Sequence, residues 1–209
     1  AFTAGVLKTI LQKQRKNKFE IVSNVVNTDL FYPTPTIQKE KKQILFVGYL
    51  KPVKGIHYLL KAIKKLQERR NDFILNVVGN SPNQKEYEDL VKKFKVENFV
   101  NFLGQKSKEE IAGYMRKADF LVSSSLFETF GVVLVEAIAC GKPVIATSCG
   151  GPKEIINEKT GILVPPKDVN ALKRAINYML DHYQSYSSEG ISQYAKENFS
   201  YEVIAKKID

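Results

Sequence analysis

Two glutamates on either side of a glycine form the most informative motif in the chain. Glu128 precedes Gly131, and Glu136 follows it after the apolar residues Val132 and Val133. If a helix begins at Gly131, the amides of Val132 and Val133 lack acceptors within the helix and lie at its positive end, where phosphate binds. Glu136 would lie about 7.5 Å further along the helix axis, so the two carboxylates would bracket a long ligand. This arrangement suits a sugar joined to a nucleoside through a diphosphate, which has hydroxyl groups at both ends and phosphates between them.

The spacing of these glutamates also fits an ordinary structural role. Glu128 could be a surface loop residue, and Glu136 could be a solvated or capping residue. A second candidate for phosphate binding is Lys54, which stands before Gly55 at the start of another expected helix and could supply a point charge. Most lysines are only solvated, so the pattern around Lys54 does not decide between binding and exposure.

Other common catalytic and metal-binding patterns are missing from the sequence. No GxGxxG or GxxxxGK[ST] motif follows an apolar run, which disfavours a dinucleotide dehydrogenase and a P-loop phosphotransferase. His57 and His182 have no carboxylate or cysteine at ligand spacing, so we expect them to be surface or packing residues and expect no metal site. Cys140 is expected to be a small buried residue, and Cys149 has no adjacent basic residue that would mark it as a nucleophile.

Short apolar runs alternate with helical patterns along most of the chain. Strands are expected at 44–47, 73–78, 100–103, 119–123, 144–147 and 161–164. Helices are expected to begin at Gly55, to span 84–95, to run from a Ser107/Glu110 capping box through Ala118, and to span 131–141 and 168–182. Apolar runs separated by helices are typical of a parallel sheet that is covered on both faces. The sequence therefore predicts an α/β fold with a doubly wound, Rossmann-like parallel sheet.

Ligands of such folds bind beyond the carboxyl ends of the strands, so three strand-to-helix junctions are candidates: 48–55, 104–107 and 123–131. Residues 32–43 contain two prolines and many charges, and they read as a linker or an exposed crossing. We divide the chain into a basic lead and interdomain segment over 1–43, a nucleotide-sugar-binding domain over 44–182 and a helical tail over 183–209.

The net charge of +10 is concentrated at the start of the chain. Residues 1–43 hold eight Lys or Arg and three Asp or Glu, so their net charge of +5 is half of the total. Phe2, Val6 and Ile10 recur at helical spacing among these basic residues, a pattern of a basic amphipathic helix that could lie on an anionic membrane surface. The alternative is a helix end that packs on a further domain. Nucleic acid is not expected as a partner, because aromatic residues are not interleaved with the lysine-rich stretches.

The sequence contains no apolar stretch long enough to cross a membrane and no export signal. Its two cysteines, Cys140 and Cys149, are too few for a disulfide framework, so a reducing compartment is expected. We therefore expect a cytoplasmic location, with peripheral contact at the inner face of the membrane as an option.

Several stretches resemble, in order, the C-terminal half of a retaining glycosyltransferase of family 4 with a GT-B fold, the group also called glycosyltransferases group 1. The similar stretches are 22–33, 44–55, 102–104, 118–119, 128–136, 139–144 and 150–154, and the resemblance extends from about residue 20 to 182. Glu128 and Glu136, with seven residues between them, reproduce the paired-glutamate motif of this family.

The resemblance implies a role for each residue of the motif. Glu128 would contact the donor hexose, Glu136 would hold the ribose hydroxyls, and the backbone of Phe130, Gly131, Val132 and Val133 would contact sugar and diphosphate. Lys54 would neutralise the diphosphate leaving group, on which charge builds as the glycosidic bond breaks. Gly48 and Tyr49 also fall in the implied donor site. Tyr49 stands where the family usually has arginine, so one cation of the family's clamp is absent.

The resemblance further implies a donor-binding half of a hexosyltransferase. The family's acceptor-binding domain would precede Ala1, and the acceptor would be a sugar or a lipid-linked molecule. The donor substrate would be a nucleotide-diphospho-sugar, and no other cofactor or metal is implied. We expect the 209-residue chain to bind this donor and to transfer sugar weakly or not at all by itself. Two alternatives are a nucleotide-sugar-binding module without turnover, suggested by Tyr49, and a basic membrane or nucleic-acid binder with an α/β scaffold.

Overall fold

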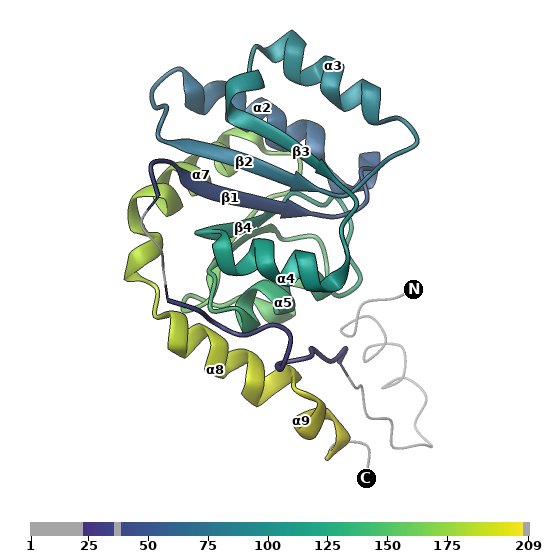
Figure 1. Cartoon of the computed structure of the whole chain (residues 1–209), viewed down its shortest axis with the longest axis vertical. Helices are drawn as coiled ribbons and strands as arrows, with labels where there is room; N and C mark the ends of the chain where they lie inside the picture. The colour runs from purple at the N-terminus through teal and green to yellow at the C-terminus, as the bar shows by residue number, and fades with distance from the viewer. Residues whose placement is uncertain (1–22, 36–38, 207–209) are drawn as a thin grey trace.

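Six parallel strands form the central sheet of the chain, as the computed structural model of residues 23–35 and 39–206 shows (Figure 1). The strands are β1 (Lys42–Val47), β2 (Phe73–Val78), β3 (Val100–Gly104), β4 (Phe120–Ser123), β5 (Val144–Thr147) and β6 (Gly161–Val164). Every pair of neighbouring strands is parallel. The prediction of a doubly wound, Rossmann-like parallel sheet is confirmed.

The order of the strands across the sheet is β3-β2-β1-β4-β5-β6. The chain moves outward from β1 to β3 and then returns to place β4 on the other side of β1. The connections on the two sides of this reversal run to opposite faces of the sheet, and in doubly wound folds ligands bind at such a point, beyond the carboxyl ends of the strands. The topology therefore brings together the loops that follow β1 and β4.

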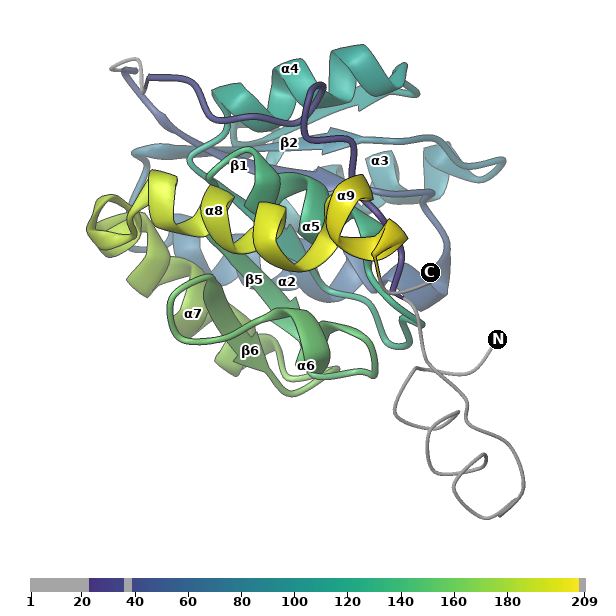
Figure 2. The same ribbon diagram turned by 90° about the horizontal axis from the view of Figure 1, so that it is seen from below.

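Helices cover both faces of the sheet (Figures 1 and 2). One face is covered by α2 (Ile56–Gln67), α3 (Gln84–Phe94) and α7 (Val169–His182), and the other by α4 (Lys108–Lys117), α5 (Val132–Ala139) and α8 (Ser188–Phe199). Side chains of β1 alternate between the two cores: Ile44 and Phe46 pack with the first set of helices and Leu45 with the second. This alternation follows from the two-residue period of a strand.

The predicted helix boundaries agree closely with the structure. The Ser107 hydroxyl accepts a hydrogen bond from the Glu110 amide, and the Glu110 carboxylate accepts one from the Ser107 amide, which confirms the capping box. The predicted cap at Asp168 is also present, because its carboxylate accepts a hydrogen bond from the Ala171 amide. Local side-chain chemistry thus determines where α4 and α7 begin.

β1 begins two residues earlier than predicted. Lys42 and Gln43 look like linker residues in sequence, but both form part of the strand. The Asp72 carboxylate lies 2.8 Å from the Lys42 ammonium, and the Asp119 carboxylate accepts a hydrogen bond of 2.6 Å from the Gln43 amide. These partners come from the residues just before β2 and β4, so tertiary contacts allow polar residues to start a central strand.

The last helices return along the second face of the sheet. α8 packs against α5, and α9 (Tyr201–Ala205) follows it (Figure 2). Val26 pairs with Ser200 in an isolated parallel bridge, so the first described segment lies beside the end of α8. No helix within residues 23–35 and 39–206 has the length and apolarity needed to span a membrane. The expected amphipathic helix with Phe2, Val6 and Ile10 falls outside these residues.

Two short helices complete the structure near the candidate site. A 3-10 helix (Pro52–Lys54) precedes α2, and α6 (Pro152–Ile155) follows a turn at Gly150-Gly151. Gly150 pairs with Glu128 in a second isolated parallel bridge. The turn is therefore attached to the loop that carries the first glutamate.

Candidate functional site

The loops after β1 and β4 are in direct contact. The Ser124 hydroxyl donates a hydrogen bond of 3.0 Å to the Lys54 carbonyl, and the Leu126 amide donates one of 2.7 Å to the Val53 carbonyl. Gly55 has a φ of +65°, and a Cβ atom at this position would lie 1.9 Å from the Ser124 carbonyl oxygen. Only glycine permits this close approach, so Gly55 lets the lysine loop pack on the glutamate loop.

This packing brings Lys54 to Glu128. The Lys54 ammonium lies 2.6 Å from Oε2 of Glu128, and the two side chains are 30% and 15% exposed. The backbone of Glu128 is also fixed, because its amide donates to the Cys149 carbonyl and its carbonyl accepts from the Gly151 amide. Glu128 is therefore not a freely solvated loop residue, and the ion pair joins the loops that follow β1 and β4.

The N-terminus of α5 lies just beyond Glu128. Gly131, with a φ of +104°, is its N-cap, and the helix begins at Val132. The first amides of a helix have no acceptors within it, and they point along the axis toward its positive end. The backbone of Val132 and Val133 thus offers hydrogen-bond donors beside the Lys54–Glu128 pair, and this combination can bind a phosphate group.

Glu136 lies on α5, one turn further into the protein. Its side chain is only 10% exposed, and Oε1 lies 3.6 Å from the ammonium of Lys108, the first residue of α4. Burial raises the pKa of Glu136 above its ordinary value, and the positive charge of Lys108 offsets part of this effect. The alternative that Glu136 is a solvated residue is wrong. A buried carboxylate whose charge is only partly balanced by a neighbouring lysine is well suited to accept hydrogen bonds from ligand hydroxyls.

A hollow of about 340 Å³ adjoins this end of the sheet. Its lining residues come from the ends of β1 and β2 and from the loop and helix after β3: Val47, Gly48, Tyr49, Val78, Gly79, Asn80, Gln105, Lys106 and Ile111. Ile111 is one helical turn after Lys108 on α4, so the hollow and Glu136 share one neighbouring helix. The hollow is large enough for an aromatic heterocycle, and α4 links its lining residue Ile111 to the contact between Lys108 and Glu136.

The sequence pointed only partly to this hollow. The junction at 104–107 was predicted, but nothing local connects it with Asn80, whose side-chain amide donates a hydrogen bond of 2.8 Å to Gln105. The sequence analysis also assigns no role in the site to Lys51. Its ammonium lies 4.8 Å from the centre of the Tyr49 ring, so a cation is present beside the position where arginine was expected.

The two cysteines and two histidines considered in the sequence analysis lie away from the candidate site or beneath it. Cys140 is fully buried, as predicted, and burial raises its pKa to about 12. His182 bonds to the backbone of its own helix and stacks on Tyr178. Burial lowers the pKa of His57, which packs against Tyr58 on α2. Cys149 is half-buried below the glutamate loop, where its carbonyl anchors Glu128.

Known proteins resemble this chain in sequence and in fold. The family model described as "Glycosyl transferases group 1" matches residues 30–198. An uncharacterised glycosyltransferase of Methanocaldococcus jannaschii is 35% identical over 175 residues, which cover 82% of this chain and 44% of that protein. Among solved structures, sucrose-phosphate synthase from Thermosynechococcus elongatus has a TM-score of 0.87 at 30% identity, covering 99% of this chain and 55% of that one.

A third similar protein was solved with a bound ligand. The Anabaena protein Alr3699/HepE in complex with UDP-glucose has a TM-score of 0.84 at 23% identity, and the match covers all of this chain and 61% of that one. At this identity the likeness concerns the fold. The chain spans about half the length of the curated relatives that it matches, with 44% and 48% of the first two covered.

Proposed function

The chain belongs to the glycosyl transferases group 1 family, and from that premise we propose that it is the donor-binding half of a retaining hexosyltransferase. The donor is a nucleotide-diphospho-sugar that lies across the carboxyl ends of β1 and β4. The observation that carries this proposal is the contact of 2.6 Å between Lys54 and Glu128 beside the N-terminus of α5. A cation, a carboxylate and free helix amides in one place match the phosphates and the sugar hydroxyls of such a donor.

The proposed donor runs along α5 from its N-terminus. The diphosphate accepts hydrogen bonds from the amides of Val132 and Val133 and from Lys54, while Glu128 binds hydroxyls of the hexose. Phe130 and Gly131 contribute backbone contacts between sugar and diphosphate. The Glu136 carboxylate binds the ribose hydroxyls, and the base enters the hollow beside Gly48 and Tyr49. The low exposure of Glu136 supports this role, since a buried acceptor gains most from a ligand donor.

The proposed chemistry is electrostatic stabilisation of the leaving group. When the bond between the sugar and the diphosphate breaks, negative charge increases on the terminal phosphate oxygens. Lys54 and the α5 amides are fixed before the reaction begins, so they can stabilise that charge without reorganisation. Glu128 holds the sugar in place while the acceptor attacks. We assign no protein nucleophile.

The acceptor, a sugar or a lipid-linked molecule, is proposed to bind to a separate N-terminal domain of the whole protein. The 209-residue chain then binds the donor but transfers sugar weakly or not at all. The net charge of +5 over residues 1–43 supports a cytoplasmic site of action near the anionic inner face of a membrane. A second candidate function is a nucleotide-sugar-binding module without turnover. Tyr49, in the position of the family's arginine, favours this second reading.

Calorimetric titration of the 209-residue chain tests the proposal. UDP-glucose is the first probe because Alr3699/HepE, which shares the fold, was crystallised with it, and GDP- and ADP-glucose follow. We expect one of the three to bind with a stoichiometry of one, and the same nucleoside without phosphates to bind much more weakly. Lack of saturable binding of all three nucleotide sugars to the folded chain would contradict the proposal. Turnover by the full-length protein distinguishes a transferase from a module without activity.

A further inference from the structure

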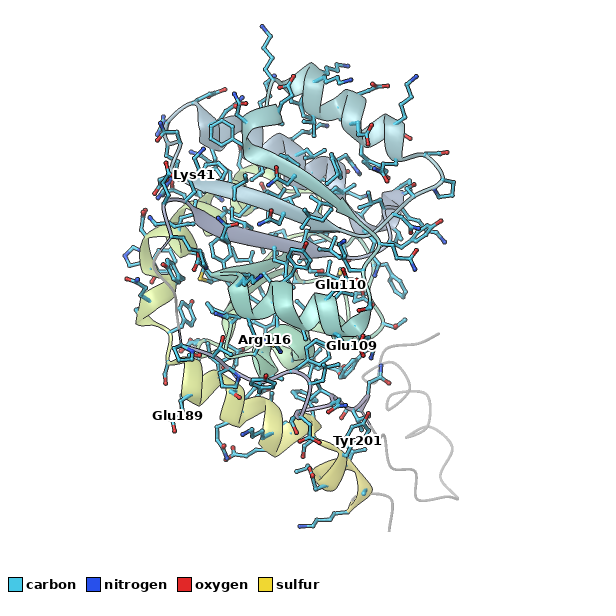
Figure 3. All side chains as sticks on the ribbon, viewed as in Figure 1. Lys41, Glu109, Glu110, Arg116, Glu189 and Tyr201 are labelled. Carbon is cyan, nitrogen blue, oxygen red and sulfur yellow. The ribbon has the colours of Figure 1, made fainter. Side chains whose placement is uncertain are left out.

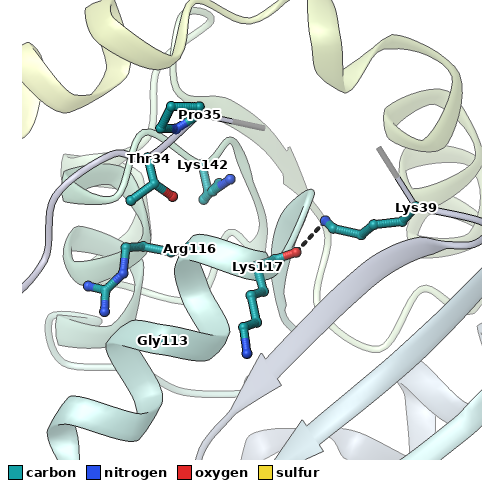
Figure 4. Close-up of a pocket in the computed structure, with 7 residues that line it drawn as sticks. All are labelled: Thr34, Pro35, Lys39, Gly113, Arg116, Lys117 and Lys142. Atoms are coloured by element: carbon teal, nitrogen blue, oxygen red, sulfur yellow. Dashed lines mark hydrogen bonds between the residues drawn. The ribbon is translucent and has the colours of Figure 1, made fainter. Parts of the chain in front are cut away.

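A second hollow lies at the opposite end of the sheet from the donor site. Its volume is about 500 Å³, and it opens between the segment before β1, the C-terminal end of α4 and the turn from α5 into β5 (Figure 4). The lining residues are Thr34, Pro35, Lys39, Gly113, Arg116, Lys117 and Lys142. Figure 3 labels Glu110 and Arg116, which mark the two ends of α4: the first lies toward the donor site and the second toward this hollow. We call it the basic pocket.

The charge of the basic pocket is strongly positive. Four of its lining residues are cationic, and none of its described lining residues is acidic. Asp119, which lines an adjacent hollow together with Lys142, already binds the Lys39 ammonium at 3.0 Å and accepts a hydrogen bond of 2.6 Å from the Gln43 amide. Among the described residues, the lining of the pocket therefore carries four positive charges and one ion pair, between Lys39 and Asp119.

Lys142 is the least solvated of these cations. It is 7% exposed, and within residues 23–35 and 39–206 no side chain forms an ion pair or hydrogen bond with its ammonium. Burial lowers the pKa of Lys142, the charge of Lys39 lowers it further, and the charge of Asp119 partly opposes both effects. No buried side-chain nitrogen or oxygen of the described residues lacks a hydrogen-bond partner, so the Lys142 ammonium reaches the space of the pocket although most of the side chain is covered. An anion in the pocket can therefore pair with it directly.

The backbone holds Lys142 firmly in this position. Gly141 ends α5 with a φ of +70°, and the Lys142 amide donates a hydrogen bond of 3.0 Å to the Ala137 carbonyl. Pro143 then leads directly into β5. The side chain therefore projects from a rigid turn, which reduces the entropy that is lost when it binds a ligand.

Polar groups from separate segments surround the space near Lys142. In Figure 4, Thr34 and Lys142 are drawn on one side of the pocket and Lys39 on the other, where its ammonium donates a hydrogen bond to the Lys117 carbonyl. In Figure 4 the side chains of Arg116 and Lys117 point away from Thr34 and Lys142. Arg116 is braced there by a hydrogen bond of 2.9 Å to the Leu30 carbonyl and by the Tyr32 ring, whose centre is 4.7 Å away.

We propose that the basic pocket binds a phosphomonoester, with Lys142 and Lys39 pairing with its charge and Thr34 donating a hydrogen bond to it. A phosphomonoester carries a charge of about −1.5 to −2 near pH 7 and several acceptor oxygens, which suits several cations better than a single carboxylate does. The source is either a small soluble phosphate ester or the headgroup of a phosphatidic acid. This site is separate from the donor site, because the two lie at opposite ends of α4.

Site-resolved binding tests the proposal on the 209-residue chain. We would titrate ¹⁵N-labelled protein with glycerol 3-phosphate at constant ionic strength and follow the amides of Gly113, Lys117 and Lys142. Saturable shifts at these amides are expected, whereas Gly131 reports separately on phosphate binding at the donor site. Shifts confined to the donor loops, or no saturable shifts, would overturn the proposal. Because the two sets of amides are distinct, failure of this proposal is distinguishable from failure of the proposed function.

Two variants establish which groups bind the phosphate. Lys142→Met is expected to raise the Kd for glycerol 3-phosphate at the basic pocket at least tenfold, and Thr34→Val several-fold. The matched control is Lys93→Gln, which removes one positive charge from an exposed position on α3 and should leave the Kd unchanged. Thr34→Val preserves the side-chain volume, so it tests the site even if Lys142→Met fails to fold. Wild-type affinity in the folded variants would contradict the assignment.

Sedimentation with vesicles identifies the source of the phosphate. Vesicles of phosphatidylcholine with added phosphatidic acid are compared with phosphatidylcholine alone, for the wild type and for Thr34→Val and Lys142→Met. Binding that requires phosphatidic acid and is weakened in the variants identifies a lipid headgroup. Binding of glycerol 3-phosphate alone identifies a soluble ester. Binding of neither probe would exclude a phosphomonoester site.

Discussion

The ammonium of Lys54 lies 2.6 Å from a carboxylate oxygen of Glu128, although the two residues are 74 positions apart in the chain. They belong to the loops after β1 and β4, which are neighbours only because the strand order reverses at this point. In this ion pair each side chain partly neutralises the other. We infer that a donor separates their roles, since Lys54 then faces phosphate and Glu128 faces sugar hydroxyls.

The first prediction concerns Glu128 and the sugar. Glu128→Gln should leave the affinity for UDP unchanged or raise it, because Lys54 is released from its ion pair. The additional affinity for UDP-glucose over UDP should decrease about tenfold, as expected for loss of a charge-assisted hydrogen bond. Calorimetry with both ligands measures the difference. Glu158→Gln, at an exposed position, is the control. An equal loss for UDP and UDP-glucose would argue against a sugar contact.

The second prediction concerns Lys54 and the diphosphate. Lys54→Met should lower the affinity for UDP by about 10- to 100-fold, since hydrogen bonds to charged groups contribute about 1.5–3 kcal/mol. Binding of uridine, which has no phosphates, should not change. Competition titrations with both ligands measure the two affinities. Lys93→Met removes the same charge at an exposed site on α3 and should behave as the wild type. A matching loss for uridine would indicate a general structural defect.

The third prediction concerns the contact between the two loops. Gly55→Ala and Gly104→Ala both place a side chain at positive φ, +65° and +73°, so both should lose about 1–2 kcal/mol of unfolding free energy. Gly55→Ala should lose about 1–3 kcal/mol more, because the new Cβ would overlap the Ser124 carbonyl oxygen, whereas nothing lies within 4 Å at Gly104. Urea denaturation of the two variants measures the difference. Equal destabilisation would contradict this account of the loop packing.

The fourth prediction concerns pH and Glu136. The folded-state pKa of this carboxyl is raised from 4.5, so its charged form is destabilised in the fold. Glu136→Gln should therefore stabilise the protein at pH 7, and the gain should disappear as the pH falls through the raised pKa to below 4.5, where both states are protonated. Thermal unfolding at several pH values tests this. The same variant should bind uridine more weakly. A lower stability of Glu136→Gln than of the wild type at pH 7 would show that the attraction between Glu136 and Lys108 exceeds the cost of burying the carboxylate.

The fifth prediction concerns the cation beside Tyr49. If Lys51 supplies part of the positive charge at the position where arginine was expected, Lys51→Gln should weaken UDP binding by up to about fivefold, the range typical of an exposed charge pair. The loss should decrease at high salt because the site is exposed to solvent. Tyr49→Arg in the Lys51→Gln background should restore affinity. Unchanged UDP binding in Lys51→Gln would exclude a role for this cation.

Much of the fold could be predicted from local patterns. The apolar runs at 73–78, 144–147 and 161–164 agree with the observed strands residue for residue, because buried parallel strands need continuous apolar side chains. The caps at Ser107 and Asp168 were visible because a cap requires one side chain and a backbone amide within three residues of it. Polar Lys42 and Gln43 were missed, since their partners Asp72 and Asp119 are distant in sequence.

The candidate site divides in the same way. The sequence alone determined the helix start at Gly131, the position of Glu136 on that helix and a lysine before Gly55, since these depend on spacing within a few residues. Only the tertiary structure decided that Lys54 binds Glu128, that Asn80 and Gln105 line one hollow, and that Lys142 is buried among other cations. The physical reason is that parallel strands pair across long connections. Which loops become neighbours depends on the order in which strands join the sheet, and no local propensity encodes that order.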